Sequence, residues 1–587
     1  MFLPCTREEM DQLGWPQLDV ILVAGDAYID SPFIGVAMIG KLLVHHGFRV
    51  GVIAQPAMNS GEDITRLGHP RLFWGVTGGC IDSMVANRTA SGCRRKTDDY
   101  TPGGLNTRRP DRAVIAYANL IRQHCKNTAP LVLGGIEASL RRVAHYDVWD
   151  NRVRRSILFD AKADYLLYGM AERTVLELAR ALDAGQSPTS IRGLCYAAAE
   201  APETALTLPA HQTTAADKAA FAAMFRTFYD NNDPITAKML AQQQDSRFLI
   251  HNPPQPPLST AELDQVHNLD FERDLHPLDR RLGPVRALDT IRFALTTHRG
   301  CYGECNFCAI AVHQGRTIQQ RSVGSIVREA ERMAVHPAFK GTIADVGGPT
   351  ANMYGFECAK KLAKGACQDK RCLFPAICPS LKIDHGPLVD LLQRLRRIKN
   401  IKKIAVASGI RYDMILADKK NGLSYLREVV RHHVSGQMKI APEHSDPGVL
   451  AAMGKPGAEA LLQFRSLFNR LTHEEGLEQF LTYYLIAGHP GCTQAAMEEL
   501  RNFCRKELHL IPRQVQLFTP TPCTWSTLMY WTETDPFGKK PCFVEKSEAG
   551  RERQKAALVG ETPRPRKDST GKTASFRKSA PRRNNKK

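Results

Sequence analysis

Apolar residues in the first part of the chain form short runs that alternate with stretches of helical spacing. Strands are predicted for four short apolar runs, at residues 19–25, 48–54, 130–135 and 164–169. Between them, apolar residues recur every three or four positions in 32–47, 111–125 and 171–182, as on one face of a helix. Asp111 is a predicted N-cap and Gly47 a predicted helix end. This alternation predicts a doubly wound, Rossmann-like parallel sheet over residues 1–210.

A polar segment separates this pattern from a second one. HNPPQPPLST (251–260) contains four prolines, and residues 211–285 are predicted to form a helical and proline-rich linker. Further strands are predicted at 291–297, 342–346, 404–408, 437–441, 480–486 and 514–518, with Ser322 as the cap of one intervening helix. Six strands in this order predict a partial (β/α)6 barrel over residues 286–545, with its chemistry at the carboxyl ends of the strands.

Positive charge gathers at the C-terminus. The net charge is +19, and residues 560–587 hold ten Lys and Arg against Glu561 and Asp568, which gives +8. Because this end of the chain has few apolar residues, 546–587 is predicted to be a basic disordered tail. Two roles are open for it: weak contact with RNA phosphates, or solubilisation alone.

The sequence favours a reducing compartment. No run of about 18 apolar residues occurs, so no membrane span is predicted. The N-terminus, MFLPCTREEMDQLGWPQLDV, lacks the charged-then-apolar plan of a secretory signal. The sixteen cysteines are therefore expected in the cytoplasm, as metal ligands or free thiols.

Three cysteines in CYGECNFC are candidate metal ligands. Cys301, Cys305 and Cys308 have x3 and x2 spacing, with no fourth cysteine nearby. A structural zinc site normally has four protein ligands, whereas three thiolates can hold three irons of a [4Fe–4S] cube and leave the fourth iron open. Taken alone, the trio is also compatible with zinc or with unrelated thiols.

The trio directly follows the first predicted strand of the barrel, and this combination resembles the radical S-adenosylmethionine (SAM) superfamily. The resemblance implies that the amino and carboxylate groups of SAM chelate the open iron. An electron from the reduced cluster then cleaves a C–S bond of SAM to give a 5′-deoxyadenosyl radical. The resemblance also implies that Phe307, the aromatic residue before the last cysteine, packs against adenine.

Three further motifs follow predicted strands of the barrel. VGGPT resembles the glycine-rich motif of the superfamily, which implies that Gly347 and Gly348 let the backbone approach the methionine part of SAM, although Pro349 stands where many members have Glu. ASGIRYD resembles the ribose motif, which implies that Ser408 and Arg411 bind the ribose and carboxylate.

The third motif, KIAPEHSDPGVLAAMGK, also resembles a segment of the superfamily. The resemblance implies that Glu443 is an acid of the cofactor site. His444 is open to two interpretations, a substrate contact or a residue at the start of a helix.

The first domain resembles the cobalamin-binding-type domains that precede some radical SAM barrels. DSPFIGVAMIGKLLVHHGFRVGVI resembles their first half, and LGGIEAS with DYLLYGMAERTVLELA resembles their second half. The cobalamin motif D-x-H-x-x-G is absent, because Tyr28 stands where the histidine would be. We therefore expect the fold to be retained without bound cobalamin.

Residues 15–545 as a whole resemble the YgiQ-type radical SAM proteins. The resemblance implies a radical SAM enzyme that receives electrons from a low-potential donor of flavodoxin or ferredoxin type. Two alternatives stay open: an RNA-modifying, methylthiotransferase-like enzyme, or a non-catalytic metal-containing protein that binds nucleic acid.

A second cysteine group lies in the predicted insertion at 358–378. Cys358, Cys367, Cys372 and Cys378 are separated by eight, four and five residues, a spacing that matches no familiar zinc pattern. Three interpretations remain open: zinc, an auxiliary iron–sulfur cluster, or reduced cysteines in a basic loop.

Overall fold

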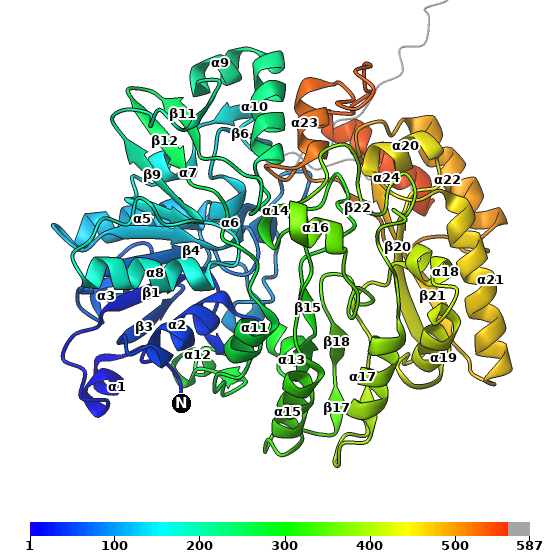
Figure 1. Cartoon of the computed structure of the whole chain (residues 1–587), viewed down its shortest axis with the longest axis horizontal. Coiled ribbons are helices and arrows are strands. Elements are labelled where there is room, and N and C mark those ends of the chain that lie inside the picture. The colour runs from blue at the N-terminus through cyan, green and yellow to red at the C-terminus, as the bar shows by residue number, and fades with distance from the viewer. Residues whose placement is uncertain (561–587) are drawn as a thin grey trace, which may run out of the picture.

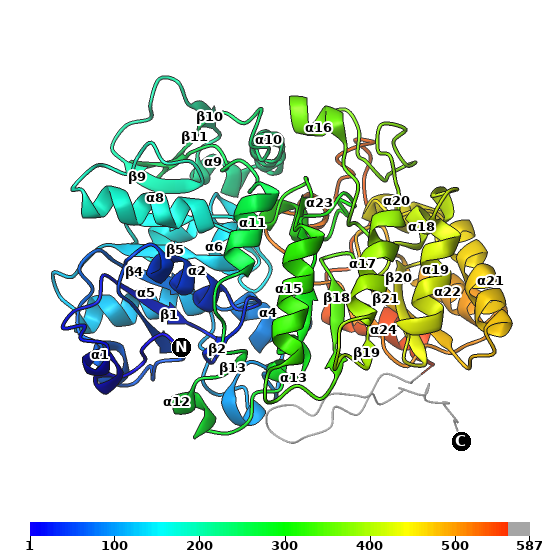
Figure 2. The same ribbon diagram turned by 60° about the horizontal axis from the view of Figure 1, so that its bottom comes forward.

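The chain folds as two α/β units that lie side by side (Figure 1). The computed structural model describes residues 1–560, so the part of the predicted tail beyond residue 560 lies outside the described residues. The first unit contains a nine-stranded sheet, and the second contains shorter parallel sheets. Figure 2 shows α11 (Thr260–His267) and α15 (Val323–Ala334) between the two units.

The nine strands of the first sheet occur in the spatial order β10, β11, β12, β9, β8, β5, β4, β1, β3. Their bounds are β1 Val20–Ala24, β3 Val50–Ala54, β4 Phe73–Thr77, β5 Leu131–Gly134, β8 Tyr165–Leu167, β9 Leu194–Ala198, β10 Leu206–Leu208, β11 Leu240–Gln244 and β12 Arg247–His251. The strands β3, β1, β4, β5 and β8 are parallel. The strand order reverses between β1 and β4, and ligands of open α/β sheets bind at such a switch point.

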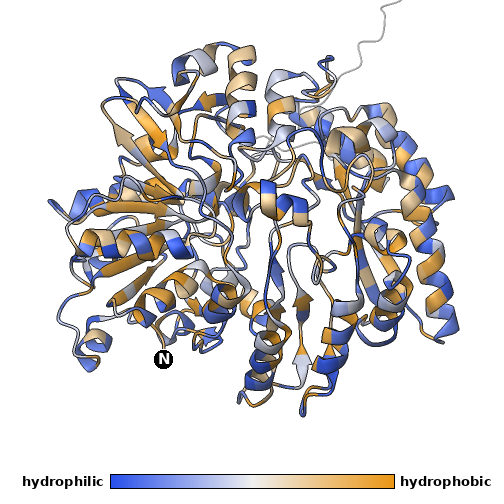
Figure 3. Cartoon of the chain, in the orientation of Figure 1, coloured by the Kyte–Doolittle hydropathy of each residue, from blue (hydrophilic) through white to orange (hydrophobic). Residues whose placement is uncertain are grey.

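Helices cover both faces of this sheet because its parallel strands are apolar on both sides. Along β1, Val20 and Leu22 pack into one apolar cluster and Ile21 and Val23 into another. The first cluster includes residues of α2 (Gly35–His45) and α8 (Glu172–Asp183), and the second includes residues of α5 (Ala113–His124). Figure 3 shows these strands as a hydrophobic layer between amphipathic helices.

The sheet is mixed, which corrects the prediction of a fully parallel one. β9 runs antiparallel to β8, and β12 runs antiparallel to both β9 and β11. β4 was not predicted, and β11, with the sequence LAQQQ, is too polar to be recognised as a strand although it is largely buried. The sheet therefore extends to residue 251, past the predicted boundary at 210 and into the predicted linker.

Two helix ends were predicted in the first unit, of which one is confirmed and one is wrong. Gly47 follows α2 with a φ of 90°, as predicted for a helix end. The predicted cap at Asp111 is wrong, because α5 begins after Arg112 without a side-chain cap. Asp111 instead accepts hydrogen bonds from Asn87 and Arg88.

Six parallel segments follow one another in the second unit. β14 (Ala294–Thr296) pairs with β18 (Asp345–Gly347), and β17 (Thr342–Ile343) pairs with β19 (Lys403–Ile404). The strands β20 (Gln437–Glu443), β21 (Phe480–Ala487) and β22 (Gln516–Leu517) form a parallel sheet. A parallel bridge between Ile410 and Ile440 joins the segment after β19 to β20. Each predicted strand of this region is therefore present near its expected position.

Helices separate most of these segments. They are α15, α17 (Gly386–Arg396), α19 (Gly422–His432), α21 (Ala458–Glu474) and α22 (Gln494–Lys506). Ser322 caps α15 by accepting the backbone N–H of Ser325, as predicted. A further helix, α24 (Glu548–Val559), packs on α22. The prediction that disorder begins at residue 546 is therefore wrong. Within residues 1–560, no helix is long and apolar enough to cross a membrane.

Buried ion pairs and a small sheet join the two units. Arg299 pairs with Glu172, and Arg273 pairs with Glu329, with all four side chains almost fully buried. β13 (Asp274–Leu275) pairs with β2 (Ile29–Asp30). The two units are thus held together by groups that are costly to separate from their partners.

We expect Arg109→Ala to lower the free energy of unfolding by about 3–5 kcal/mol, the usual cost of breaking a buried ion pair. Arg109 is fully buried between Asp26, which follows β1, and Asp98, at 2.8 and 3.0 Å. Without the guanidinium, two buried carboxylates lose their counter-charge. Urea denaturation measures the change. As a control, Arg286→Ala removes an exposed pair with Asp99 and should cost less than about 1 kcal/mol. Equal effects of the two substitutions would contradict the prediction.

Candidate functional site

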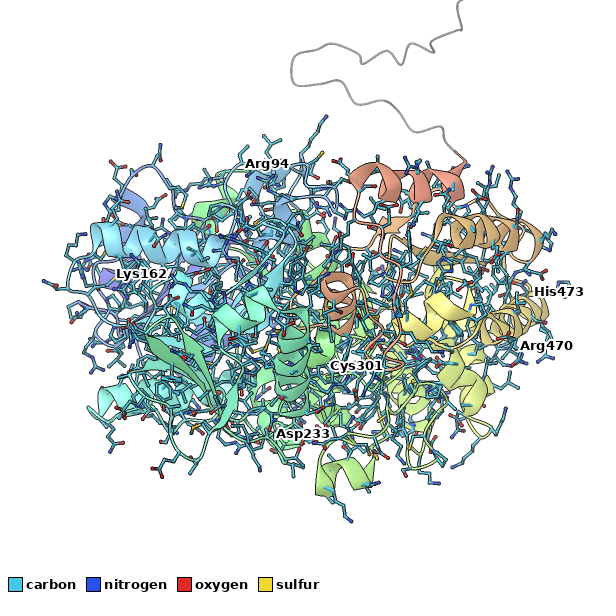
Figure 4. All side chains as sticks on the ribbon, turned by 90° about the horizontal axis from the view of Figure 1, so that it is seen from above. Arg94, Lys162, Asp233, Cys301, Arg470 and His473 are labelled. Atoms are coloured by element: carbon cyan, nitrogen blue, oxygen red, sulfur yellow. The ribbon has the colours of Figure 1, made fainter. Side chains whose placement is uncertain are left out.

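The cysteine trio lies on a loop near the middle of the molecule, where Cys301 is labelled in Figure 4. The loop follows β14 and β15 (His298–Arg299) and ends at α14 (Ile310–His313), which packs against α6 (Gly135–Leu140) of the first unit. The Cys301 N–H donates to the Gly315 carbonyl at 3.3 Å, which closes the loop on itself. The trio therefore lies beside the contact between the two units.

The three sulfur atoms are not gathered as closely as the ligands of one metal ion. Among residues 1–560, only Cys5, Glu9 and His276 form a group of three candidate ligands whose atoms all lie within 4.8 Å of one another. The three thiols are thus more widely spread than the thiolates of one zinc ion, which lie about 3.8 Å apart for a Zn–S bond of about 2.3 Å. Three irons of a cube, each bound by one cysteine, need such a wider spread.

A residue between the cysteines, Asn306, bonds to two distant parts of the fold. Gly303 lies between two thiols: a Cβ there would be 3.2 Å from the Cys301 Sγ and 3.7 Å from the Cys305 Sγ. Asn306 bonds through its backbone N–H to the Met453 carbonyl, at the end of α20 (Pro447–Met453). Its own carbonyl accepts the N–H of Ser526 in α23 (Trp525–Thr532). Distant segments thus fix the shape of the loop.

Burial disfavours charged thiolates in this loop. It raises the pKa of Cys301, and it raises the pKa of Cys308 to about 12, with the neighbouring cysteines adding to both effects. A positive partner is needed to hold these sulfurs as thiolates.

Arg411 brings a positive charge to the trio. Its Nη1 lies 3.8 Å from the Cys305 Sγ. Its other two guanidinium nitrogens form a bidentate ion pair with Asp413, at 2.6 and 2.8 Å. The Asn352 side chain holds the Arg411 backbone by bonding both its N–H and its carbonyl. Burial alone would lower the pKa of Arg411, but Asp413 outweighs burial and raises it. The structure therefore places this predicted site residue beside the cysteines.

The predicted glycine motif lies at the end of β18. Close packing against neighbouring residues is a second reason why glycine stands at these positions. A Cβ on Gly348 would come within 2.7 Å of the His298 ring and carbonyl, so this glycine is required by packing. A Cβ on Gly347 would touch Ala351 and Ser408 at 3.3–3.4 Å. The Ser408 hydroxyl donates to Asp345 of β18. Ser408 and the glycine motif therefore lie together, with Asp345 as a partner that the sequence analysis missed.

Glu443 has the features of a ligand-binding acid. It is 4% exposed, and its Oε2 has no hydrogen-bond partner within the described chain. Its Oε1 lies 3.6 Å from the Lys455 ammonium. Its φ is 70°, at a register shift of β20, and strained backbone of this kind gathers at functional sites. Burial raises the pKa of its carboxyl.

His444 lies between β20 and the cap of α20, which favours the second of its two interpretations. Its Nδ1 accepts the backbone N–H of Asp446, the residue that caps α20. Burial lowers its pKa to about 4, so the ring is neutral near pH 7.

Phe307 packs edge-on against His489, with ring centroids 6.2 Å apart. The His489 Nε2 lies 2.7 Å from the Ser526 hydroxyl, and burial lowers its pKa to about 3. His489 was not predicted as a site residue, although its segment AGHPG begins at the last residue of β21. This histidine connects the cysteine loop to α23.

A cavity of about 310 Å³ lies at the switch point of the first sheet. Its wall is mainly apolar and comes from the carboxyl ends of β1, β4, β5 and β8, with Gly75, Gly134 and Gly135 among the lining residues. Ile310, His313 and Gln314, which follow the cysteine trio, line it from the second unit. The cavity thus lies between the first sheet and the helix that begins beyond Cys308.

Tyr28 does not face this cavity. Its hydroxyl bonds to the Leu3 N–H and to Asp30, and its ring stacks on His276 at 5.6 Å. The residue at position 28 therefore says nothing about what the cavity binds. The presence of Tyr28 in place of a histidine is therefore no argument against cobalamin binding in this cavity.

Comparisons with known proteins give a consistent picture. A family model described as Radical SAM N-terminal matches residues 2–294. A UPF0313 protein of Fusobacterium nucleatum is 55% identical over 555 residues, which are 94% of this chain and 98% of that relative. A UPF0313 protein of Thermotoga maritima is 48% identical over 564 residues, 95% of this chain and 98% of the relative.

A solved structure shares the fold at low identity. It is the cobalamin-dependent S-adenosylmethionine radical enzyme OxsB with aqua-cobalamin bound. The TM-score is 0.50 with 13% identity, over 90% of this chain and 57% of OxsB. The likeness concerns the fold alone, and the expectation that this chain binds no cobalamin is left without support.

Proposed function

The chain belongs to the UPF0313 family of radical SAM proteins, and from this membership we propose that it is a radical SAM enzyme. When bound, a [4Fe–4S] cluster and SAM together supply a 5′-deoxyadenosyl radical by reductive cleavage. We assign the three cluster thiolates to Cys301, Cys305 and Cys308. The six parallel segments of the second unit are then the partial (β/α)6 barrel that carries the site.

The convergence of Cys301, Cys305 and Arg411 around Gly303 carries this proposal. The trio has three sulfurs spread more widely than a single metal ion needs. Gly303 leaves the space between two of them free of side-chain atoms, and Arg411 adds positive charge at Cys305. A thiolate-bound cluster carries net negative charge, so the guanidinium stabilises it.

The residues around the trio suit the groups of SAM. The free Oε2 of buried Glu443 is an acceptor for the SAM ammonium, because a buried carboxylate oxygen without a partner is costly. Gly347 and Gly348 offer backbone groups to the methionine part, and Ser408 with Asp345 offers hydroxyl and carboxylate oxygens to the ribose. Phe307 offers its partly exposed ring to adenine, with His489 behind it.

The test is SAM cleavage by protein purified without oxygen. With dithionite as the reductant, we expect 5′-deoxyadenosine and methionine to form in equal amounts, and neither to form without reductant. A flavodoxin- or ferredoxin-type donor should replace dithionite. Protein that retains its iron, is reduced by dithionite and forms no 5′-deoxyadenosine would contradict the proposal.

Cobalamin-dependent radical chemistry is a second candidate, favoured by the apolar cavity at the switch point. That cavity reaches α14, directly after Cys308, so a ligand in it would lie next to the cluster site. Titration with hydroxocobalamin tests this candidate. Stoichiometric binding that Gly75→Phe abolishes would support it, whereas no binding by the unmodified protein would exclude it.

A further inference from the structure

The four cysteines of the insertion line one cavity. Cys358, Cys367, Cys372 and Cys378 share it with Glu304, Lys360, Lys361, Lys370, Arg371, Ser380 and Leu381. We propose that these four cysteines bind a second [4Fe–4S] cluster. The inference does not depend on SAM chemistry at the first site.

The insertion is held in place by specific contacts. The Cys378 N–H donates to the Cys372 carbonyl at 2.8 Å, which brings two of the cysteines together. The Ala366 N–H donates to Asp233 of the first unit at 2.9 Å, and Figure 4 labels Asp233 on the same side of the molecule as α16 (Ala359–Lys364). Cys358 and Cys372 pack on a small apolar cluster that includes Tyr302. The four thiols are thus gathered by the fold.

The four sulfurs are not gathered as closely as the ligands of one zinc ion. No three of them lie within 4.8 Å of one another, since among residues 1–560 only the group at Cys5 meets that condition. Four thiolates on one zinc ion would lie about 3.8 Å apart for a Zn–S bond of about 2.3 Å. In a cube each cysteine binds a different iron, so its ligands are more widely separated. The insertion shares this feature with the first trio.

The charges around the cavity suit a bound anion. Four cations, Lys360, Lys361, Lys370 and Arg371, line it against one carboxylate, that of Glu304. Lys361 is 3% exposed, and its Nζ lies 3.6 Å from the Cys372 Sγ and 3.4 Å from Glu304. A cube with four thiolates carries net negative charge and would pair with these cations.

Glu304 connects the two cysteine groups. It lies between Cys301 and Cys305 in the chain, and its carboxylate contacts Lys361 beside Cys372. Arg371 donates to the Glu304 carbonyl at 3.2 Å. A cube with four protein ligands has no open iron, so we assign the second cluster to electron transfer with the first rather than to SAM binding.

Iron counting on the full-length protein tests the inference. After anaerobic reconstitution with ferric iron, sulfide and dithiothreitol, we expect about eight irons per chain, four for each cube. The triple variant Cys301→Ala, Cys305→Ala, Cys308→Ala should keep about four irons, with the Mössbauer and EPR signatures of a [4Fe–4S] cluster. This variant leaves the insertion intact, so its result does not depend on how insertion variants fold.

The complementary variant replaces all four cysteines of the insertion with serine and should also keep about four irons. The control Cys542→Ser, a cysteine outside both groups, should keep all of them. A triple variant without iron, or with one zinc per chain in its place, would overturn the inference. Absence of 5′-deoxyadenosine with both clusters present would instead count only against the proposed function.

Discussion

Replacing Cys301, Cys305 and Cys308 together with alanine is expected to abolish reductive SAM cleavage, by at least about 1,000-fold, and to remove about four irons per chain. The three thiols are the only ligands that we assign to this cluster, and the neighbouring residues stabilise it without binding iron. Metal analysis and quantification of 5′-deoxyadenosine measure the two losses in the same samples. Iron bound elsewhere in the chain should survive.

The matched control is Cys504→Ala, a buried cysteine in α22 far along the chain from the trio. It controls for the loss of a buried thiol and should leave both quantities unchanged. A triple variant that still produced 5′-deoxyadenosine above the level without enzyme would show that the trio is not the cluster site.

Arg411→Gln is expected to lower kcat/KM for SAM cleavage by about 100-fold. Charge-assisted hydrogen bonds contribute about 1.5–3 kcal/mol, and about 2.7 kcal/mol corresponds to 100-fold in rate. The guanidinium lies between the Cys305 thiol and Asp413, so its loss removes positive charge from the cluster site and leaves a buried carboxylate unpaired. Steady-state SAM cleavage with equal iron loading measures the effect.

Two further variants separate the causes. In Arg411→Gln combined with Asp413→Asn, no carboxylate is left unpaired, yet the positive charge beside Cys305 is still missing, so activity should stay low. Arg427→Gln changes an exposed arginine that pairs with Glu474 and Glu475 and should have no effect. Full recovery in the double variant would show that Arg411 acts only by neutralising Asp413.

Local patterns were enough to predict β1, β3, β5 and β8, although not β4, because a parallel strand that is apolar on both faces appears as a short apolar run. Val20–Ala24 and Val50–Ala54 are buried at every position, and each appears in the sequence as a continuous apolar run. β11 is buried too, but its glutamines bond within the fold: Gln242 accepts the Ala144 N–H and donates to the Pro209 carbonyl. Partners of this kind, distant in sequence, make a polar strand invisible to periodicity.

The residues of the candidate site also fall into two groups, those that a local motif reveals and those that depend on a partner distant in sequence. Arg411 and Glu443 were recognised from short motifs, and the structure places Arg411 beside the trio and leaves an oxygen of Glu443 unpaired. Asp345, Asn352 and His489 were missed because each acts on a residue from another segment: Asp345 on Ser408, Asn352 on Arg411, and His489 on Phe307. A single sequence does not reveal which distant residues meet.

The ties of Asn306 have a consequence for biosynthesis. The cysteine loop is fixed on one side by the end of α20 and on another by Ser526, a residue that leaves the ribosome long after the trio itself. During translation the three thiols are therefore displayed on a loop that lacks its later supports. The loop gains its support from Ser526 only after α23 has been synthesised, so iron delivery to the fully supported site follows the synthesis of that helix.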